Sequence, residues 1–190
     1  MISKLCSNHP YWGVRTLVEN DHDIIMLTFS HYTYKPQSLT DERKIYSISR
    51  QDFLNEPLVL GAINSTPEDQ EFALHSTILH RTLGQMHIPM IDMSTGSGAQ
   101  LEKVRPVLGE SVFFDFDWYK SGRSYHGYGR SLLTQNDWIK QMGKLLLVNQ
   151  IGVPPTVDPR WVGHRLIAGY ASLRWTKNTP QYLDYPRRVS

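Results

Sequence analysis

The chain has very little cysteine, and this scarcity excludes several kinds of site. Its 190 residues contain one cysteine, Cys6, which rules out an internal disulfide and any zinc site that needs two or more thiolates. A lone cysteine is typical of a reducing compartment, so we expect a cytoplasmic protein. The sequence has no apolar run of about 18 residues, and its start, MISKLCSNHP, lacks the apolar core of a signal peptide. We therefore expect no membrane partner.

The sequence also lacks the simplest nucleotide- and metal-binding motifs. Residues 94–98 are rich in glycine and serine, but no Gly-Lys-Ser/Thr follows them, so they do not form a P-loop. The aspartate spacing of a Ca²⁺-binding loop is absent as well. The formal net charge is only +2, so a nucleic-acid surface would require the basic residues to be clustered. Any nucleotide site must therefore be sought in other motifs.

Strand and helix patterns are mixed along the chain without a strict strand–helix–strand rhythm. Alternation, short apolar runs and turn residues predict strands at residues 14–18, 23–31, 44–47, 57–63, 87–93, 112–119, 124–130 and 171–175. Helical spacing and capping residues predict helices at 66–83, 101–108 and 134–148. This mixture indicates one domain of the α+β class with a mixed or antiparallel sheet. We divide it into a small N-terminal α/β unit (about 1–56), a main unit (about 57–177) and an irregular tail (178–190).

The stretch FFDFDWYKSGRSYHGYGR predicts two strands joined by a tight turn. Alternate residues of a strand share a face, so Phe114, Phe116 and Trp118 would form the core face of the first strand. Asp115 and Asp117 would lie on the opposite, polar face. Such a pair of aspartates is a common way to hold a divalent metal.

The position of the turn decides which residues of the two strands face each other. A two-residue turn at Ser121-Gly122 would place Asp117 opposite His126, Asp115 opposite Tyr128 and Tyr119 opposite Ser124. The polar face would then hold Asp115, Asp117, Ser124, His126, Tyr128 and Arg130. A three-residue turn would break this pairing. Two interpretations stay open: the water-exposed side of an ordinary antiparallel sheet, or part of a metal and phosphate site.

Two further aspartates stand where a metal site would be expected. Asp92 ends a short apolar segment and faces the glycine-rich turn that follows. Asp158 comes after Val157 and precedes a group of basic residues, namely Arg160, His164, Arg165, Arg174 and Lys177. A carboxylate beside several cations suits a divalent metal together with a triphosphate.

Taken in order, these residues resemble the archaeo-eukaryotic primase and primase-polymerase superfamily. Its catalytic core carries an acid pair on a strand, a Ser-x-His on a later strand, and a hydrophobic residue followed by Asp. Here SGRSYHGY, with Ser124 and His126, is similar to the second motif, and Val157-Asp158 with the later LRWTK is similar to the third. MIDMSTGSG, which contains Asp92, occupies the place of the first. The resemblance spans about 57–177 and implies that this part is a catalytic unit with an RRM-like sheet.

The chain departs from the family at Ser94, which stands where the family has the second acid of the first motif. The resemblance implies that Asp92 and Asp158 bind Mg²⁺ or Mn²⁺, and two-metal chemistry would then need negative charge from elsewhere. Asp115 and Asp117 are the expected donors of that charge and are candidate metal ligands. In an alternative alignment, Asp115-Phe116-Asp117 is itself the first motif.

The resemblance implies a nucleotidyltransferase of the primase or DNA-directed polymerase type, which takes nucleoside triphosphates and a single-stranded DNA or RNA template. Asp92, Asp158 and His126 would be the catalytic residues, with His126 on a triphosphate oxygen. The expected phosphate- and template-binding residues are Ser124, His126, Arg123, Arg130, Arg165, Arg174 and Lys177. Trp161, Tyr170 and Trp175 would either stack on bases or, as is more common, pack in the core. Because the chain leaves no room for a helicase or accessory domain, we expect a protein partner to supply one.

Two alternatives remain open. Ser94 favours a catalytically degenerate domain that binds nucleic acid or nucleotide, or serves as an interaction subunit. A metal-dependent nuclease could instead use Asp92, Asp115, Asp117 and His126.

Overall fold

The computed structural model describes residues 4–189, and its strands form two antiparallel sheets. Sheet A has the order β2-β1-β3-β4, with β8 also paired to β3, and sheet B has the order β5-β7-β6-β9. The strands of sheet A are β1 (Ile24–Tyr32), β2 (Arg43–Ser49), β3 (Glu71–His80), β4 (Gly84–His87) and β8 (Ser172–Arg174). Those of sheet B are β5 (Met90–Asp92), β6 (Phe116–Ser121), β7 (Ser124–Gly129) and β9 (Arg187–Arg188). This architecture confirms the α+β class.

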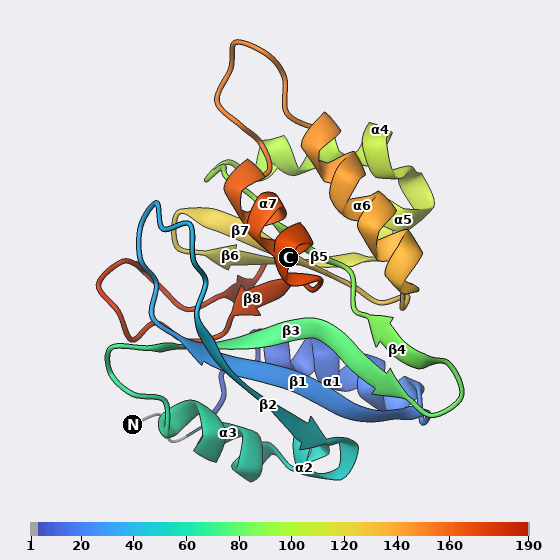
Figure 1. The fold of residues 1–190 in the computed structure, drawn as a ribbon, viewed down its shortest axis with the longest axis vertical. Helices are drawn as coiled ribbons and strands as arrows, with labels where there is room; N and C mark the ends of the chain where they lie inside the picture. The colour runs from blue at the N-terminus through green and yellow to red at the C-terminus, as the bar shows by residue number, and fades with distance from the viewer. Residues whose placement is uncertain (1–3, 190) are drawn as a thin grey trace.

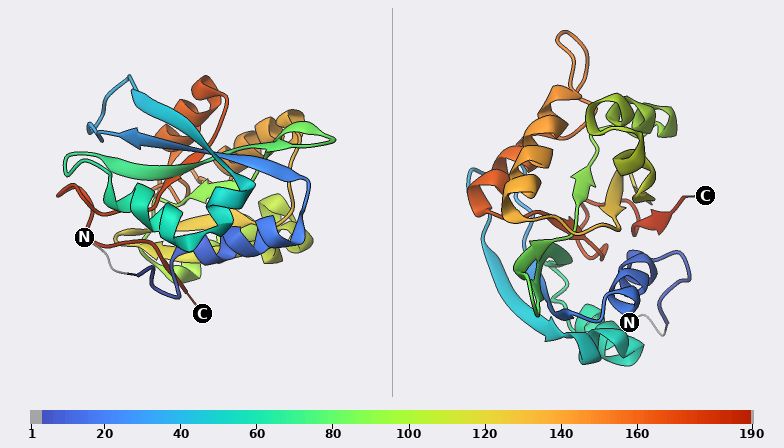
Figure 2. Two further views of the ribbon diagram at one scale, coloured as in Figure 1. Left: turned by 90° about the horizontal axis from the view of Figure 1, so that it is seen from below. Right: turned by 90° about the vertical axis from the view of Figure 1, so that its right-hand side faces the viewer.

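The helices divide between the two sheets, as Figures 1 and 2 show. Beside sheet A lie α1 (Pro10–Asn20), α2 (Arg50–Leu54) and α3 (Glu56–Asn64). Around sheet B lie the 3-10 helix η1 (Gly98–Val104), α4 (Arg105–Leu108), α5 (Glu110–Phe114), α6 (Gln135–Leu147) and α7 (Pro159–Ala168). Within residues 4–189, the helices are all too short or too polar to cross a membrane.

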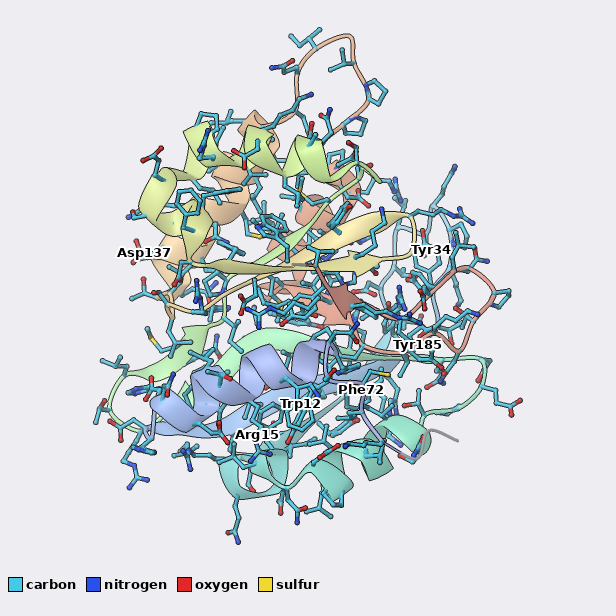
Figure 3. All side chains as sticks on the ribbon, turned by 180° about the vertical axis from the view of Figure 1, so that it is seen from behind. Trp12, Arg15, Tyr34, Phe72, Asp137 and Tyr185 are labelled. Carbon is cyan, nitrogen blue, oxygen red and sulfur yellow. The ribbon has the colours of Figure 1, made fainter. Side chains whose placement is uncertain are left out.

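Helix α1 joins the two halves of the molecule, and Figure 3 shows it from behind with Trp12 and Arg15 labelled. The Tyr11 ring lies 5.3 Å from Phe53 and 6.4 Å from Trp175, centroid to centroid. Gly13 lies so close to the Tyr119 hydroxyl of β6 that a Cβ at this position would collide with it. Aromatic packing on one side and this close approach on the other fix α1 between the sheets.

Two segments predicted as strands are helices. Residues 14–18 lie within α1, whose first turn is capped by the His9 side chain, which accepts a hydrogen bond from the Tyr11 N–H. Residues 57–63 lie within α3, and its first turn holds Pro57, where a missing N–H costs nothing. A short apolar run does not distinguish a strand from a buried helix, and here the start signals decide the outcome.

The helix predicted at residues 66–83 is wrong, because this segment contains β3, the central strand of sheet A. β3 pairs with β1 on one edge and with β4 and β8 on the other. A strand covered on both faces does not alternate between apolar and polar residues. The apolar residues of β3 are therefore spaced in a way that also fits one face of a helix. The Thr66-Pro67 signal instead forms a turn, which the Gln70 N–H closes by donating to the Pro67 carbonyl at 3.0 Å.

The strand predicted at 112–119 begins later than expected. Residues up to Phe114 form α5, Asp115 caps its C-terminus, and β6 starts at Phe116. Phe114 is therefore not on the core face of the strand, and 61% of its surface is exposed. Asp115 likewise does not lie on the polar face of the hairpin.

The hairpin turn lies one residue later than predicted. Ser121 pairs with Ser124, and the turn residues are Gly122, with φ at 71°, and Arg123. A glycine with positive φ at the first turn position suits a two-residue hairpin. The pairing is thereby shifted by two residues, so Tyr119 faces His126, Asp117 faces Tyr128, and the three predicted pairs are wrong.

The other predicted elements appear in the structure, whereas α2 and α7 were not predicted. The predicted strands at 23–31, 44–47, 124–130 and 171–175 appear as β1, β2, β7 and β8, and the helices at 101–108 and 134–148 as η1 with α4 and as α6. The segment 87–93 is divided between the end of β4 and β5. The tail 178–190 is mostly irregular but contains β9, which extends sheet B.

Candidate active site

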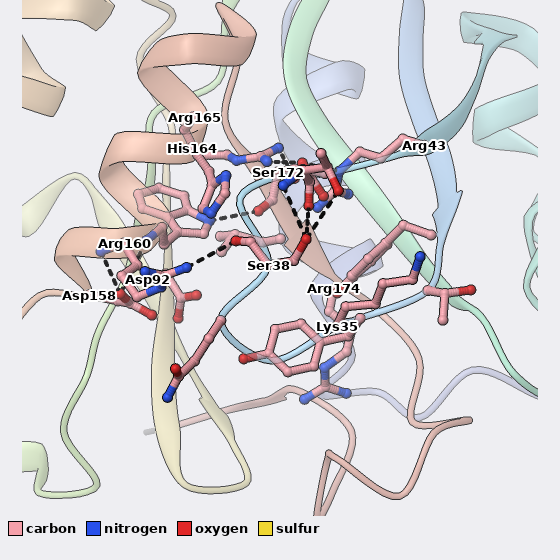
Figure 4. A pocket seen from close by; sticks show the side chains of 18 of the residues that line it. Lys35, Ser38, Arg43, Asp92, Asp158, Arg160, His164, Arg165, Ser172 and Arg174 are labelled. Atoms are coloured by element: carbon pink, nitrogen blue, oxygen red, sulfur yellow. Dashed lines mark hydrogen bonds and ion pairs between the residues drawn. The ribbon is translucent and has the colours of Figure 1, made fainter.

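Backbone pairing between distant segments brings Asp92, His126 and Asp158 together. Asp92 is the last residue of β5 and pairs with His126 of β7. The next residue, Met93, forms an isolated antiparallel bridge with Val157, and the Asp158 N–H donates to the Asp92 carbonyl at 3.0 Å. The three side chains line one cavity of about 170 Å³ that opens between the two sheets, and Figure 4 shows Asp92 and Asp158 side by side within it.

Asp158 is placed by the start of α7. It is the N-cap residue, and its carboxylate accepts hydrogen bonds from the N–H groups of Arg160 (2.9 Å) and Trp161 (3.1 Å). Pro159 follows in the first turn, which is a strong helix start. The carboxylate thus lies at the positive end of the helix dipole.

Asp92 is in a much less favourable setting for a negative charge. Burial, followed by the negative charge of Asp158, raises its pKa to about 8, although Arg174 and Arg165 act in the opposite direction. At neutral pH the Asp92 carboxyl therefore holds a proton. Two carboxyl groups that disfavour each other's charge form a natural position for a cation.

His126 is buried and neutral. Its Nε2 lies 3.7 Å from Oδ1 of Asp92, and burial, with a smaller contribution from Arg174, lowers its pKa well below the usual 6.5. Within the described part of the chain, its buried Nδ1 has no hydrogen-bond partner. A neutral imidazole that lines the cavity can donate one hydrogen bond to a ligand or accept one from it.

Two buried arginines face the same cavity. Arg165 of α7 is 2% exposed and donates to the Ser172 hydroxyl at 2.9 Å. Arg174 of β8 is 3% exposed; it donates to the Ser121 hydroxyl at 2.9 Å and its guanidinium lies 3.9 Å from the Tyr182 ring centroid. Its terminal nitrogens also donate to the carbonyls of Thr176 and Asp184. Among residues 4–189, no carboxylate lies within ion-pair distance of Arg174, so no acidic side chain pairs with its buried charge.

The sequence did not indicate that the β1–β2 loop, residues 33–42, forms one wall of this cavity. The cavity is lined by Lys35, Ser38 and Asp41 of the loop and by Arg43 at the start of β2. The charged run DERK, which follows Thr40, is the signal that could have drawn attention to it. Its proximity to Asp92 and Asp158 depends on long-range pairing that the sequence does not show.

Asp115 and Asp117 lie outside this cavity. The Asp115 carboxylate accepts from the N–H groups of Arg130 (3.0 Å) and Ser131 (2.8 Å). Asp117 is paired with Arg188 of β9 and faces a separate hollow beside α1. Each carboxylate thus has a structural partner of its own.

Other predicted phosphate-binding residues are also apart from the cavity. Arg123 is exposed in the hairpin turn, Lys177 is exposed after β8, and Ser124 pairs with Ser121 at the hairpin end. Arg130 donates to the carbonyls of Phe114 and Asp115 and lines the separate hollow beside α1. Of the arginines and lysine predicted to bind phosphate or template, the structure brings Arg165 and Arg174 to the cavity of Asp92 and Asp158. Arg160 and His164, from the basic group after Asp158, line it as well.

The three candidate stacking residues have different environments. Trp175 is fully buried and belongs to the core, as does most of the aromatic cluster around it. Tyr170 stacks on the His75 ring at 4.2 Å. Trp161 lines the cavity, where its indole N–H donates to the Ser172 carbonyl at 3.0 Å, and it is the one of the three placed to meet a ligand.

The donor set fits one divalent cation better than two. In the part of the chain that the structure describes, no three His, Cys, Asp or Glu side chains are grouped as a metal site. Asp92 and Asp158 nevertheless form a pair whose mutual repulsion a cation would relieve. Ser94, at the position of the missing acid, is exposed and its N–H donates to the Thr156 carbonyl at 2.8 Å.

Comparison with known proteins identifies one family. The family model described as archaeo-eukaryotic primase 1D-like matches residues 50–187, which include β3, the hairpin, α7 and β8. Neither the curated proteins nor the solved structures provide a match.

Proposed function

Since this chain belongs to the archaeo-eukaryotic primase 1D-like family, we propose that it is a nucleotidyltransferase. It would take nucleotides from nucleoside triphosphates and add them to a growing strand, with single-stranded DNA or RNA as the template. The observation that supports this proposal is a single cavity with a carboxyl pair, Asp92 and Asp158, and buried guanidinium groups, Arg165 and Arg174. Carboxylates suit a divalent cation and guanidinium groups suit phosphate oxygens.

The residues have distinct roles in this proposal. Asp92 and Asp158 would hold Mg²⁺ or Mn²⁺, which when bound orients the triphosphate and offsets the charge that develops on it. Arg165 and Arg174 bind phosphate oxygens, and His126, being neutral, donates its N–H to another. The 3′-hydroxyl oxygen attacks the α-phosphorus, pyrophosphate leaves, and the hydroxyl proton passes to water. Positioning and charge stabilisation supply most of the rate in such a transfer.

One observation favours a second candidate function. The cavity has one carboxyl pair, Asp92 and Asp158, because its third acid, Asp41, is paired with arginines. Ser94, Asp115 and Asp117 add no further acid to that pair. A domain of this family that binds nucleotide or nucleic acid without transferring nucleotides would have this composition. A nuclease that uses Asp115 and Asp117 with His126 receives no support, because both aspartates lie in other parts of the structure.

The decisive experiment is primer extension on single-stranded template with Mn²⁺ and labelled NTPs or dNTPs, with Asp158→Asn and Asp158→Ala as test variants. Asparagine caps a helix as well as aspartate, so Asp158→Asn should retain stability, while Asp158→Ala should lose about 1 kcal/mol. Both should lower extension by roughly a hundredfold or more, as expected when a group that stabilises developing charge is lost.

The control is Asp137→Asn, which removes an exposed carboxylate from the first turn of α6. Extension by the Asp158→Asn variant at the wild-type rate would reject the metal-binding role of Asp158. If the wild-type chain binds NTP with Mn²⁺ but extends nothing, the non-catalytic candidate is the correct one. A helicase or accessory partner protein stays a prediction, and it should be added to the assay if one is found.

A further inference from the structure

A carboxylate of this chain already occupies the basic side of the cavity. Oδ2 of Asp41 accepts a hydrogen bond from Nε of Arg43 at 2.8 Å, and the same oxygen is bonded by Nη2 of Arg165. The two arginine side chains are 8% and 2% exposed, whereas that of Asp41 is 24% exposed. An acidic side chain at the edge of the loop thus reaches two largely buried guanidinium groups.

The two arginines are held in place independently of Asp41. Arg43 donates from Nη1 to the Ser30 hydroxyl of β1 at 3.1 Å, and Arg165 donates from Nη1 to the Ser172 hydroxyl of β8 at 2.9 Å. Both serines belong to strands of sheet A. Because these anchors lie in the sheet, the guanidinium groups would keep their positions if Asp41 moved away.

The charge of this cluster is not balanced by Asp41 alone. Two guanidinium groups share one carboxylate, and Lys35 and Arg174 line the same cavity. An anion with several oxygens and more than one charge would satisfy the two arginines better than a single carboxylate oxygen does.

The loop that carries Asp41 is held by arginines of the site and by a contact between the rings of Tyr34 and Tyr182, whose centroids lie 5.7 Å apart. Arg160 donates to the Ser38 carbonyl at 2.9 Å, and Arg43 and Arg165 bind Asp41. Ser38 and Thr40 otherwise bond each other within the loop. The arginine contacts that hold Ser38 and Asp41 are therefore of the kind that a phosphate ligand would replace.

The cluster also lies in the right place to receive the far end of a triphosphate. Figure 4 shows Arg43, Arg165 and Ser172 on one side of the cavity and Asp92 and Asp158 on another. A nucleotide whose α-phosphate lies at the carboxyl pair would extend its terminal phosphates along the cavity. Arg43 and Asp41 lie outside the 50–187 range of the family match, so the match assigns them no role.

We infer that Arg43 and Arg165 form a subsite for the terminal phosphates of a nucleoside triphosphate, and that Asp41 occupies it until the ligand binds. This inference rests on the proposed function for the identity of the ligand, but the subsite is tested separately from nucleotide transfer. Asp41 lowers the apparent affinity for the ligand, because the fraction of molecules with a vacant subsite sets the affinity that is observed.

The probe is inorganic tripolyphosphate, titrated by calorimetry without divalent metal, so that neither the carboxyl pair nor catalysis contributes. Asp41→Asn should bind it about tenfold more tightly than the wild-type chain, because a competing charge-assisted hydrogen bond is lost. Asp41→Ser is the second variant, since the Asn amide oxygen can still accept from the arginines.

Glu42→Gln is the matched control: it removes the same charge from the neighbouring, exposed position and should bind like wild type. Arg43→Gln should bind at least tenfold more weakly.

Hydrogen exchange supplies a measurement that needs no substitution. Tripolyphosphate should accelerate exchange of the amides at residues 38–42 in the wild-type chain, since the ligand displaces the contacts of the loop.

Equal or weaker binding by both Asp41 variants, no binding by any variant, or unchanged exchange in the loop would overturn the inference. Tighter binding by the Asp41 variants without primer extension by any form would retain the subsite and reject the proposed function. If the wild-type chain extends primers but the Asp41 variants bind tripolyphosphate no differently from wild type, the proposed function is retained and the subsite is rejected.

Discussion

At the scale of single residues, the fold raises the pKa of Asp92, one of the two acids proposed to bind the metal. Its side chain is 23% exposed, its backbone is fixed between His126 and Asp158, and its pKa is raised to about 8. The protein holds this carboxyl close to a second one at a cost in stability, which is common where a cation is to be bound.

The raised pKa predicts how stability depends on pH in the absence of metal. An unfolded Asp92 ionises near 3.8, while in the folded chain it keeps its proton up to about pH 8. Between these values the folded state binds the extra proton, so the contribution of Asp92 to the free energy of unfolding is greatest at low pH and declines as pH rises to about 8. The decline can reach at most about 1.4 kcal/mol per pH unit.

Urea denaturation of the wild-type chain and of Asp92→Asn at intervals from pH 5 to 8.5 measures this effect. Asparagine cannot ionise, so the variant should gain stability relative to wild type as pH rises. Asp69→Asn, which removes an exposed carboxylate, is the control and should give a difference that changes little with pH. A constant difference between wild type and Asp92→Asn across this range would show that Asp92 is not held protonated.

The sequence predicted those candidate site residues that belong to short motifs. Asp92, His126 and Asp158 stand in recognisable short motifs, and the structure brings all three to one cavity. Arg43 and Asp41 lie in an ordinary charged run, and only the pairing of β1 with β2 and β3 places them there. Motif spacing identifies a residue when its neighbours form a recognised motif, and the charged run DERK around Arg43 is not such a motif.

At the scale of elements, the segment after β8 is ordered by one buried acid. Glu71, the first residue of β3, accepts hydrogen bonds from the N–H groups of Asn178 (3.0 Å) and Thr179 (2.7 Å), and from the hydroxyls of Thr179 (2.8 Å) and Thr176. This segment leads to Tyr182, whose ring lies under the Arg174 guanidinium in the cavity. Glu71 therefore links the sheet to one wall of the site.

Removal of this carboxylate should loosen the segment. We expect Glu71→Ala to lower the free energy of unfolding by about 3 kcal/mol, because several buried donors lose a charged acceptor together. Denaturant titration measures the loss, and hydrogen exchange at residues 176–182 should rise more than at β1. Glu68→Ala, at an exposed position, should leave both unchanged. A loss below about 0.5 kcal/mol would contradict this role for Glu71.

The elements that the sequence misassigned share a physical cause. β3 is covered on both edges and most of its residues are buried, so its sequence lacks the alternation of a half-exposed strand. The register of the β6–β7 hairpin depended on a single turn residue, Gly122, and an error of one position shifted every pair. By contrast, α6 has a Thr134 cap, Asp137 in its first turn and one apolar face, and all of these local signals agree.

At the scale of the whole molecule, the cavity is made by segments far apart in sequence. The β1–β2 loop and β8 belong to sheet A, while β5 and β7 belong to sheet B and α7 connects them. A ligand that touches all of these segments is bound by the folded chain and not by the unfolded one. Binding should therefore stabilise the whole molecule and not one half of it.

This arrangement predicts that a nucleoside triphosphate with Ca²⁺, which avoids turnover, raises the stability of the chain in a single transition. At a free ligand concentration of about 100 times Kd, the gain should be about 2.7 kcal/mol. Thermal unfolding followed by both far-UV circular dichroism and tryptophan fluorescence measures it, and the two signals should shift together. The double variant Asp92→Asn with Asp158→Asn should lose most of the gain that depends on Ca²⁺, whereas Asp115→Asn, outside the cavity, should retain it. Separate shifts of the two signals, or a full gain in the double variant, would mean that the ligand binds elsewhere than between the sheets.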